Sequence, residues 1–198
     1  MTIQSLNRWG AAAVIAASLL FAASAIAVIV VPDGGLANPV APTLYYAGLI
    51  LAVPSYIALY AAQAATAGKL GFAGLTMSII GSIMYSGPVF VLIAGTSGIA
   101  TWHDVWGFAM RSVLPLGASI FLIGSTLFGA ATTRAGVFPR QSGWLLAVGS
   151  FLWLIVFYIP VPFLLSISNL MAAGALAWMA FHLYPRTRAE SLQARQAL

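Results

Sequence analysis

The sequence has no cysteine and very little charge. Its 198 residues include eight lysines and arginines, three acidic residues and two histidines, so that charged residues make up only 6% of the chain. A soluble domain typically has roughly 25%. The lack of cysteine excludes a disulfide, a thiolate metal site and a cysteine nucleophile. The scarcity of charge excludes a soluble globular domain.

Apolar residues take the place of the missing charge along the whole chain. Hydrophobic residues make up 62% of the sequence, and the mean hydropathy is +1.00. A membrane span requires about 20 predominantly apolar residues. Six segments meet this requirement, at residues 10–31, 43–66, 71–94, 109–131, 143–158 and 163–183. The sequence therefore predicts an all-α fold, a polytopic six-transmembrane-helix bundle in the lipid bilayer. It forms a single membrane domain over residues 1–198, with a short basic tail at 185–198.

The basic residues are scattered between the predicted spans. The net charge is +5, but the chain lacks the clustered basic stripe that follows phosphates, and we expect no nucleic-acid partner. Basic residues near span ends stay on the cytoplasmic side of a membrane. Seven of the eight fall on one side of the predicted topology, namely Arg8, Lys69, Arg134, Arg140, Arg186, Arg188 and Arg195. We therefore expect both termini in the cytoplasm.

The general character of the chain is similar to that of small integral proteins of bacterial inner membranes. It combines Ala/Gly-rich spans with the predicted cytoplasmic turn Ala-Gly-Val-Phe-Pro-Arg at residues 135–140. The resemblance implies location in the plasma (inner) membrane. Aromatic residues fall at predicted span ends, where their rings prefer the headgroup level. We interpret Trp9 and Trp144 at inner ends, and Tyr45 and Tyr46 at outer ends, as interfacial anchors.

Small residues recur every four positions in the third predicted span. Gly74, Ser78, Ser82 and Ser86 therefore share one face of a helix. Small residues let a second helix approach closely, and their hydroxyls can form hydrogen bonds across the contact. We interpret this face as a helix-packing seam within the chain. The alternative is a docking face for a membrane-protein partner or for a second copy of the chain.

One motif resembles that of a known enzyme family. The segment 95–98, Gly-Thr-Ser-Gly, followed by a later histidine, is similar to the Gly-x-Ser-Gly motif of rhomboid intramembrane proteases. Here Ser97 ends a span on the outer side and His182 ends one on the inner side. Roughly 30 Å therefore separates two groups that must come within about 3 Å. We predict no catalytic residue and no metal site. The cofactor is unknown. A haem or chlorophyll-type pigment with a single histidine ligand, His103 or His182, is an alternative that the sequence allows.

A further pattern favours a ligand near the outer ends of the spans. One proline lies within each of the second, third and fourth predicted spans, and broken helices favour an interior cavity because their freed carbonyls need new partners. Arg111 is the one basic residue on the outer side, and Asn169 lies at a similar depth in the last span. Together with Asp104 and His103 of the preceding outer loop, they are the candidate ligand-binding residues.

Three functions are compatible with these patterns. We expect a non-enzymatic accessory or interaction subunit. The first alternative is a small-molecule binding or transport component with an outward-facing cavity near Arg111 and Asn169, and the second is a pigment- or haem-binding subunit with one histidine ligand. In size and topology the chain resembles the substrate-binding S components of energy-coupling-factor vitamin transporters. Their first helix carries an Ala-x-x-x-Ala seam, which Ala12 and Ala16 match. That resemblance implies small-molecule binding.

Overall fold

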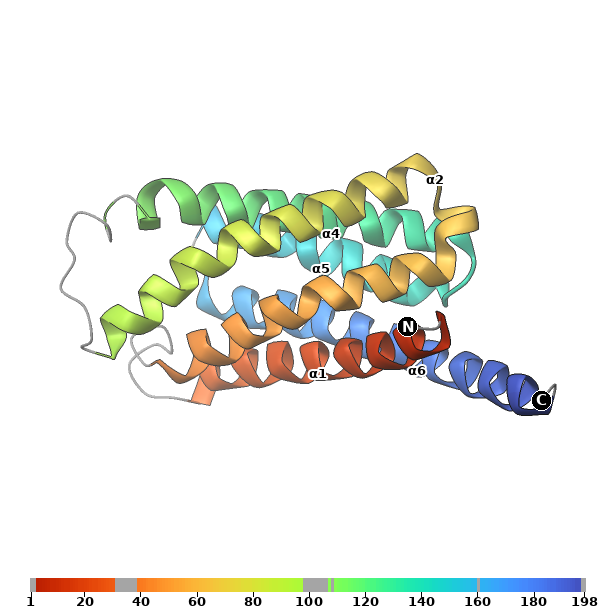
Figure 1. Ribbon diagram of the computed structural model, residues 1–198. Helices are drawn as coiled ribbons and strands as arrows, with labels where there is room; N and C mark the ends of the chain where they lie inside the picture. The colour runs from red at the N-terminus through yellow and green to blue at the C-terminus, as the bar shows by residue number, and fades with distance from the viewer. Residues whose placement is uncertain (1–2, 31–38, 98–106, 108, 160, 197–198) are drawn as a thin grey trace.

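The computed structural model describes residues 3–30, 39–97, 107, 109–159 and 161–196, and this part of the chain contains helices and turns but no strand (Figure 1). The elements are α1 (Ile3–Val30), α2 (Val40–Thr96), the π-helix η1 (Ala109–Val113), α4 (Leu114–Ala135), α5 (Arg140–Tyr158) and α6 (Pro162–Gln196). The predicted all-α fold is confirmed.

Five of these helices are long and apolar enough to cross a membrane. The chain is therefore a multi-pass membrane protein by the length and composition of its helices. The predicted number of six is not confirmed, because two predicted spans, 43–66 and 71–94, fall within the single 57-residue helix α2. Three of the remaining predicted spans lie within η1 with α4, α5 and α6, and the first, 10–31, lies in α1 up to Val30, with residue 31 outside the described residues.

Helix α2 bends sharply at Gly68. The backbone there takes φ 59° and ψ −163°, a conformation that side-chain-bearing residues rarely adopt. We call residues 40–67 the first arm of α2 and residues 69–96 the second arm. Figure 1 shows α2 folding back on itself, and the hydroxyl of Ser82 in the second arm donates a hydrogen bond of 2.7 Å to the Leu49 carbonyl in the first. The two arms therefore lie side by side.

The second arm of α2 packs on α4 through glycines of both helices. A Cβ atom added at Gly81 would collide with the backbone nitrogen of Phe121, and one added at Gly124 would lie 2.5 Å from the backbone nitrogen of Ser78. The two backbones touch because neither helix carries a side chain at these points. We call this region the glycine contact, and it consists of Gly74, Gly81, Gly117 and Gly124.

The predicted seam lies on the buried side of the second arm. Gly74, Ser78 and Ser82 are buried, and Ser86 is half-buried. A Cβ atom added at Gly74 would lie 2.5 Å from the backbone nitrogen of Phe128 in α4, whereas Ser82 bonds the first arm. The seam therefore contacts α4 through Gly74 and the first arm of α2 through Ser82.

Hydrogen bonds between side chains join the first arm of α2 to α4. The Tyr56 hydroxyl donates to Ser125 Oγ at 2.7 Å, and Gln63 Nε2 donates to Thr132 Oγ1 at 3.0 Å. On each helix the two bonding residues lie seven positions, or about two turns, apart. The first arm and α4 therefore run parallel in register, and these bonds tie together the interior of the bundle.

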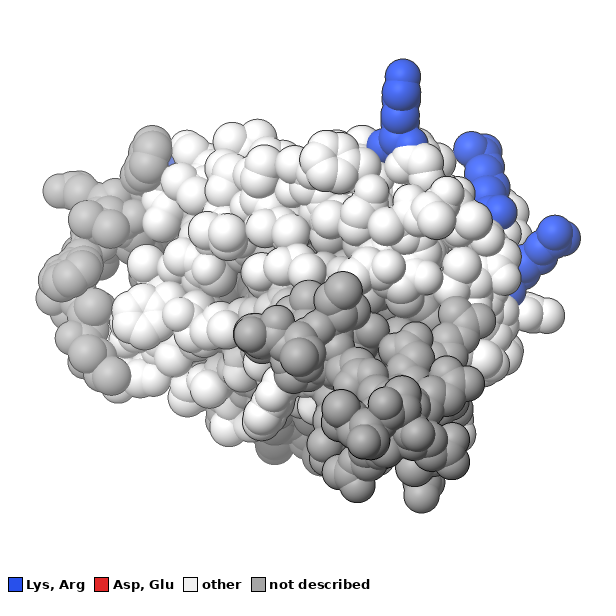
Figure 2. Space-filling view, turned by 45° about the vertical axis from the view of Figure 1, so that its right-hand side comes forward, with Lys and Arg blue, Asp and Glu red and all other residues white. Residues whose placement is uncertain are grey.

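The two ends of the bundle differ in charge. Lys69, Arg134 and Arg140 are exposed where the arms of α2 meet and where α4 gives way to α5. Figure 2 shows the basic side chains gathered at this end, which we call the basic end. The beginning of α1 and the end of α6 lie there too (Figure 1). Arg111 in η1 is exposed at the opposite end.

Large apolar side chains face outward along the bundle. Ile83 is 61% exposed, Trp9 71% and Phe181 81%. A soluble protein rarely exposes large apolar areas. This outer surface is compatible with contact with a lipid bilayer.

Candidate functional site

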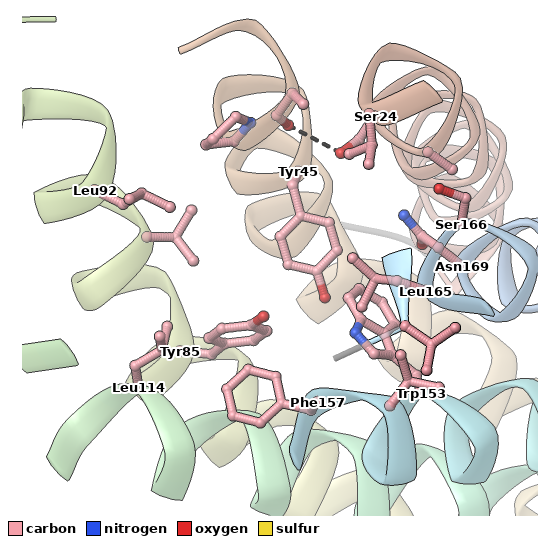
Figure 3. Close-up of a pocket in the computed structure, with 17 residues that line it drawn as sticks. Ser24, Tyr45, Tyr85, Leu92, Leu114, Trp153, Phe157, Leu165, Ser166 and Asn169 are labelled. Atoms are coloured by element: carbon pink, nitrogen blue, oxygen red, sulfur yellow. Dashed lines mark hydrogen bonds between the residues drawn. The ribbon is translucent and has the colours of Figure 1, made fainter. Parts of the chain in front are cut away.

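A cavity of about 310 Å³ lies at the end of the bundle opposite the basic end. The close-up in Figure 3 draws 17 residues that line it. They come from the last turns of α1, the ends of both arms of α2 far from Gly68, the start of α4, the end of α5, and the start of α6 with Val161 just before it. Every long helix of the bundle therefore contributes to its wall.

The cavity begins where the glycine contact ends. A Cβ atom added at Gly117 would still lie 2.7 Å from the backbone nitrogen of Tyr85, and Tyr85 itself lines the cavity. Beyond this point Leu92 of α2 and Leu114 of α4 both line the cavity. The two helices therefore touch along the glycine contact and both border the cavity farther from the basic end.

Aromatic rings form one wall of the cavity. The ring of Tyr45 lies at the centre, with centroid distances of 5.0 Å to Trp153, 5.6 Å to Tyr85 and 5.2 Å to Phe21. Such tilted and edge-on pairs add to the stability that burial alone supplies. Figure 3 shows the hydroxyl groups of Tyr45 and Tyr85 and the indole nitrogen of Trp153 pointing toward one another.

Several polar atoms of the cavity wall lack hydrogen-bond partners. In the described part of the chain, six buried side-chain nitrogen or oxygen atoms have no partner within the protein. Four of the six belong to residues that line this cavity: Tyr45 Oη, Trp153 Nε1, Ser166 Oγ and Asn169 Oδ1. These side chains are between 2% and 6% exposed. Unpaired buried polar groups cost free energy, so their concentration around one cavity makes it the candidate site.

Asn169 is held in place by one end of its amide. Its Nδ2 donates a hydrogen bond of 3.1 Å to the carbonyl of Phe21 in α1, which leaves Oδ1 as the unpaired atom. A carbonyl cannot donate, so the reverse amide orientation would set two oxygens against each other. The chemistry of the partner thus assigns the amide orientation.

Ser24, another polar residue of the wall, has a hydrogen-bond partner within the protein. The Ser24 hydroxyl donates a hydrogen bond of 2.9 Å to the Ala41 carbonyl, drawn as the dashed line in Figure 3. This bond ties α1 to the first arm of α2. Ser24 therefore has a structural partner, whereas Ser166 on the facing helix has none.

A second, smaller cavity adjoins the first. It measures about 20 Å³ and shares Trp153 and Asn169 with the larger cavity. It also contacts Tyr56 and Ser125, the hydrogen-bonded pair between α2 and α4. A volume of this size accommodates a single water molecule. Trp153 and Asn169 thus stand between the main cavity and the polar interior of the bundle.

The structure brings one of the four predicted ligand-binding residues to the cavity. Asn169 lines it, whereas Arg111 is exposed and does not belong to its lining. His103 and Asp104 lie outside the described residues. The structure therefore does not bring Arg111 and Asn169 together in this cavity.

Sequence reasoning missed three side chains of the site. Tyr45 was expected to be an interfacial anchor, but it is only 6% exposed because it packs between α1, α2 and α5. Trp153 and Ser166 carried no signal, because they lie in stretches that are apolar on all sides. By contrast, Trp9 and Trp144 are exposed at 71% and 59%.

The described lining offers hydrogen bonds and apolar contact but no charge. None of its 17 residues is Asp, Glu, Lys, Arg, His or Cys. Elsewhere in the described residues, no group of three or more His, Cys, Asp or Glu side chains is placed to hold a metal ion. His182 is exposed, with Nδ1 3.0 Å from the Trp178 carbonyl, and does not line the cavity. The arrangement is therefore suited to binding an uncharged molecule.

Comparison with known proteins finds no matching family model, no matching curated protein and no matching solved structure.

Proposed function

We propose that the chain crosses the membrane six times. The length of α2 supports this number, since 57 residues would extend about 86 Å as a straight helix. The hydrocarbon core of a bilayer is only about 30 Å thick. Each arm of α2 is about 42 Å long at 1.5 Å per residue, which suffices for one crossing. Six crossings place both ends of the chain on the same side.

The proposed orientation puts the basic end in the cytoplasm of a bacterium, with the chain in the inner membrane. Exposed Lys69, Arg134 and Arg140 favour this orientation through the preference of basic loops for the cytoplasmic side. Both termini are then cytoplasmic, and the cavity lies toward the outer face.

Cysteine labelling tests this orientation directly, because the chain has no cysteine of its own. Lys69 and Arg111 are both exposed, at opposite ends of the bundle. We expect a membrane-impermeant thiol reagent applied to intact cells to label Arg111→Cys but not Lys69→Cys. Labelling of Lys69→Cys alone would show the reverse orientation.

The proposed function is a small-molecule binding or transport component of the membrane. The observation that carries it is the cavity of about 310 Å³ with four unpaired polar atoms in its wall. Ligand sites typically have volumes of about 300 to 1,000 Å³ and apolar walls with a few polar groups. The paucity of charge in the lining favours an uncharged ligand, because a buried charge without a partner is costly.

These features favour ligand binding over the accessory-subunit function. A protein that serves only as a packing partner gains nothing from unpaired polar groups around a cavity, and each such group costs about 1 to 3 kcal/mol. A ligand that enters the cavity relieves part of this cost. A membrane-protein partner or a second copy of the chain on the apolar outer surface remains compatible with this proposal.

Filling the cavity tests the function. Leu165 lines the cavity on α6, and Val161, which is 40% exposed, lines it just before that helix. We expect Leu165→Trp and Val161→Trp to reduce binding of the apolar probe butylbenzene by protein in phosphatidylcholine nanodiscs. Equilibrium dialysis with subtraction of empty nanodiscs measures the binding.

A matched control has the same substitution outside the cavity. Leu116 is 53% exposed and does not line it, so Leu116→Trp should bind butylbenzene as the unchanged protein does. If neither cavity substitution lowers binding below that of Leu116→Trp, the proposed function is wrong.

A further inference from the structure

We infer that the ligand of the cavity is a neutral amphiphile whose polar group both donates and accepts hydrogen bonds, such as an alcohol, a phenol or a primary amide. This inference rests on the proposed binding function and assigns the chemical class of the ligand. Its basis is the particular pair of unpaired atoms on Asn169 and Trp153.

Asn169 requires a donor from the ligand. One N–H of its Nδ2 donates to the Phe21 carbonyl, and the unpaired Oδ1 is a carbonyl oxygen that can only accept. A ketone, an ether or a hydrocarbon has no hydrogen to offer it. The ligand group beside Asn169 therefore carries an O–H or N–H.

Trp153 requires an acceptor from the ligand. An indole N–H donates and never accepts, and Nε1 has no partner within the described protein. Both Trp153 and Asn169 line the main cavity and the smaller one. One unpaired donor and one unpaired acceptor thus belong to residues that line the same two cavities, and a hydroxyl or an amide can supply both partners with a single functional group.

The neighbouring hydroxyls adapt to either role. Tyr45 and Ser166 can each donate or accept, because a hydroxyl does both, and neither has a partner in the described structure. These two groups therefore complete the pairing of the ligand without restricting its class. Because all four atoms are almost completely covered, we expect ligand entry to involve a small rotation of the side chains that carry them.

The remainder of the cavity selects the apolar body. Val28, Val89, Leu92 and Leu165 line it together with the ring of Phe157. No described lining residue could neutralise a carboxylate, a phosphate or an ammonium group, and such charges lose their hydration on burial. The ligand is therefore uncharged throughout, and it is apolar apart from its hydrogen-bonding head.

Four probes of similar shape separate these requirements. 4-Butylphenol both donates and accepts hydrogen bonds, and it is neutral at pH 7 because the pKa of a phenol is about 10. 4-Butylanisole only accepts, butylbenzene does neither, and 4-butylbenzoate is charged. Binding is measured by dialysis against protein in phosphatidylcholine nanodiscs, with empty nanodiscs subtracted. Partition into lipid works against the expected result, because the anisole and the hydrocarbon are more apolar than the phenol.

We expect 4-butylphenol to bind at least tenfold more tightly than 4-butylanisole and butylbenzene, a difference of about 1.4 kcal/mol. 4-Butylbenzoate should bind no better than butylbenzene. Trp153→Phe keeps an aromatic ring beside Tyr45 but removes the N–H, and Asn169→Leu removes the acceptor. Each substitution should abolish most of the preference for the phenol. Butylbenzene should still bind both variants within about threefold, which also shows that their cavities are intact.

The outcomes distinguish this inference from the proposed function. One outcome is that the three neutral probes bind equally well and that Leu165→Trp and Val161→Trp abolish this binding. It would overturn the ligand class but support the binding function. Binding of 4-butylanisole as tight as that of 4-butylphenol would overturn the donor requirement, and tighter binding of 4-butylbenzoate would overturn neutrality. A preference that survives both Trp153→Phe and Asn169→Leu would overturn the assigned residues. If Leu165→Trp and Val161→Trp lower the binding of none of the probes, the proposed binding function itself is wrong.

Discussion

Two regions of the bundle, the glycine contact and the cavity, bury small polar side chains in different surroundings. Beside the glycine contact, the hydroxyl of Ser82 donates to the Leu49 carbonyl at 2.7 Å. In the cavity wall, the equally buried hydroxyl of Ser166 has no partner within the described protein. Both serines are almost fully removed from the surface, so burial alone does not explain the difference.

The difference follows from how closely the backbones approach. Between the two arms of α2, the backbones lie near enough for the Ser82 hydroxyl of one arm to reach the Leu49 carbonyl of the other. At the end opposite the basic end, the helices surround a cavity of about 310 Å³. Close packing of the arms of α2 therefore pairs the Ser82 hydroxyl, whereas four covered polar atoms of the residues around the cavity stay without partners within the described protein.

The pairing at the basic half of the bundle is not complete. Ser78 Oγ and Gln63 Oε1 are the two remaining unpaired buried atoms of the described residues, although Gln63 bonds Thr132 through its other amide atom. Neither residue lines the main cavity. The concentration of four such atoms in one wall therefore distinguishes the cavity from the rest of the interior.

The largest effect is expected from a methyl group added at the glycine contact. Gly81→Ala sets a Cβ atom against the backbone of Phe121, which cannot rotate away, and overpacking of this kind costs about 3 kcal/mol. Gly87→Ala, six residues along the same arm, meets nothing within 4 Å and should leave stability unchanged or slightly higher. Thermal unfolding in detergent, followed by circular dichroism, compares the two. Equal melting temperatures would show that the contact is looser than described.

The next largest effect concerns how readily a small thiol reagent reaches cysteines placed in the cavity wall and between the arms of α2. Ser166→Cys places a thiol in the cavity wall, and Ser82→Cys places one between the arms of α2. Reaction at the second site requires the helices to open, so we expect methyl methanethiosulfonate to modify Ser166→Cys at least about tenfold faster. Quantification by intact-protein mass spectrometry has no background, since the chain has no other cysteine. Similar rates would contradict the distinction between an accessible cavity and a closed contact.

Much of the fold could be predicted from the sequence, because the bilayer imposes strong rules on length and polarity. Each predicted span other than the first, which extends to residue 31, lies wholly within the described helices. The joining of two spans into α2 was not predictable from the sequence. The same few residues around Gly68 could form a loop between two helices or a bend after which helical hydrogen bonding resumes at once. Only the backbone geometry there, with φ 59°, shows the bend within one helix.

The site was harder to predict because a sequence reveals the depth of a residue better than the face on which it lies. Arg111 and Asn169 were assigned similar depths, yet Arg111 is exposed and Asn169 is buried. An amphipathic stripe usually marks the inward face of a helix, but a membrane helix is apolar on both faces. Tyr45 and Trp153 therefore gave no sign that their rings pack against each other 5.0 Å apart inside the bundle.

The smallest effect comes from removing single hydroxyls, and its sign should differ between the two regions. Ser82→Ala loses the hydrogen bond to Leu49, and we expect the free energy of unfolding to fall by about 1 kcal/mol. Ser166→Ala removes a buried hydroxyl that has no partner. Its stability should stay the same or rise by a few tenths of a kcal/mol, since an unpaired polar group no longer has to be buried. Reversible unfolding in mixed micelles measures both variants under identical conditions. A loss at Ser166→Ala as large as that at Ser82→Ala would mean that the Ser166 hydroxyl already has a stabilising partner, and the contrast between the cavity and the glycine contact would no longer hold at that residue.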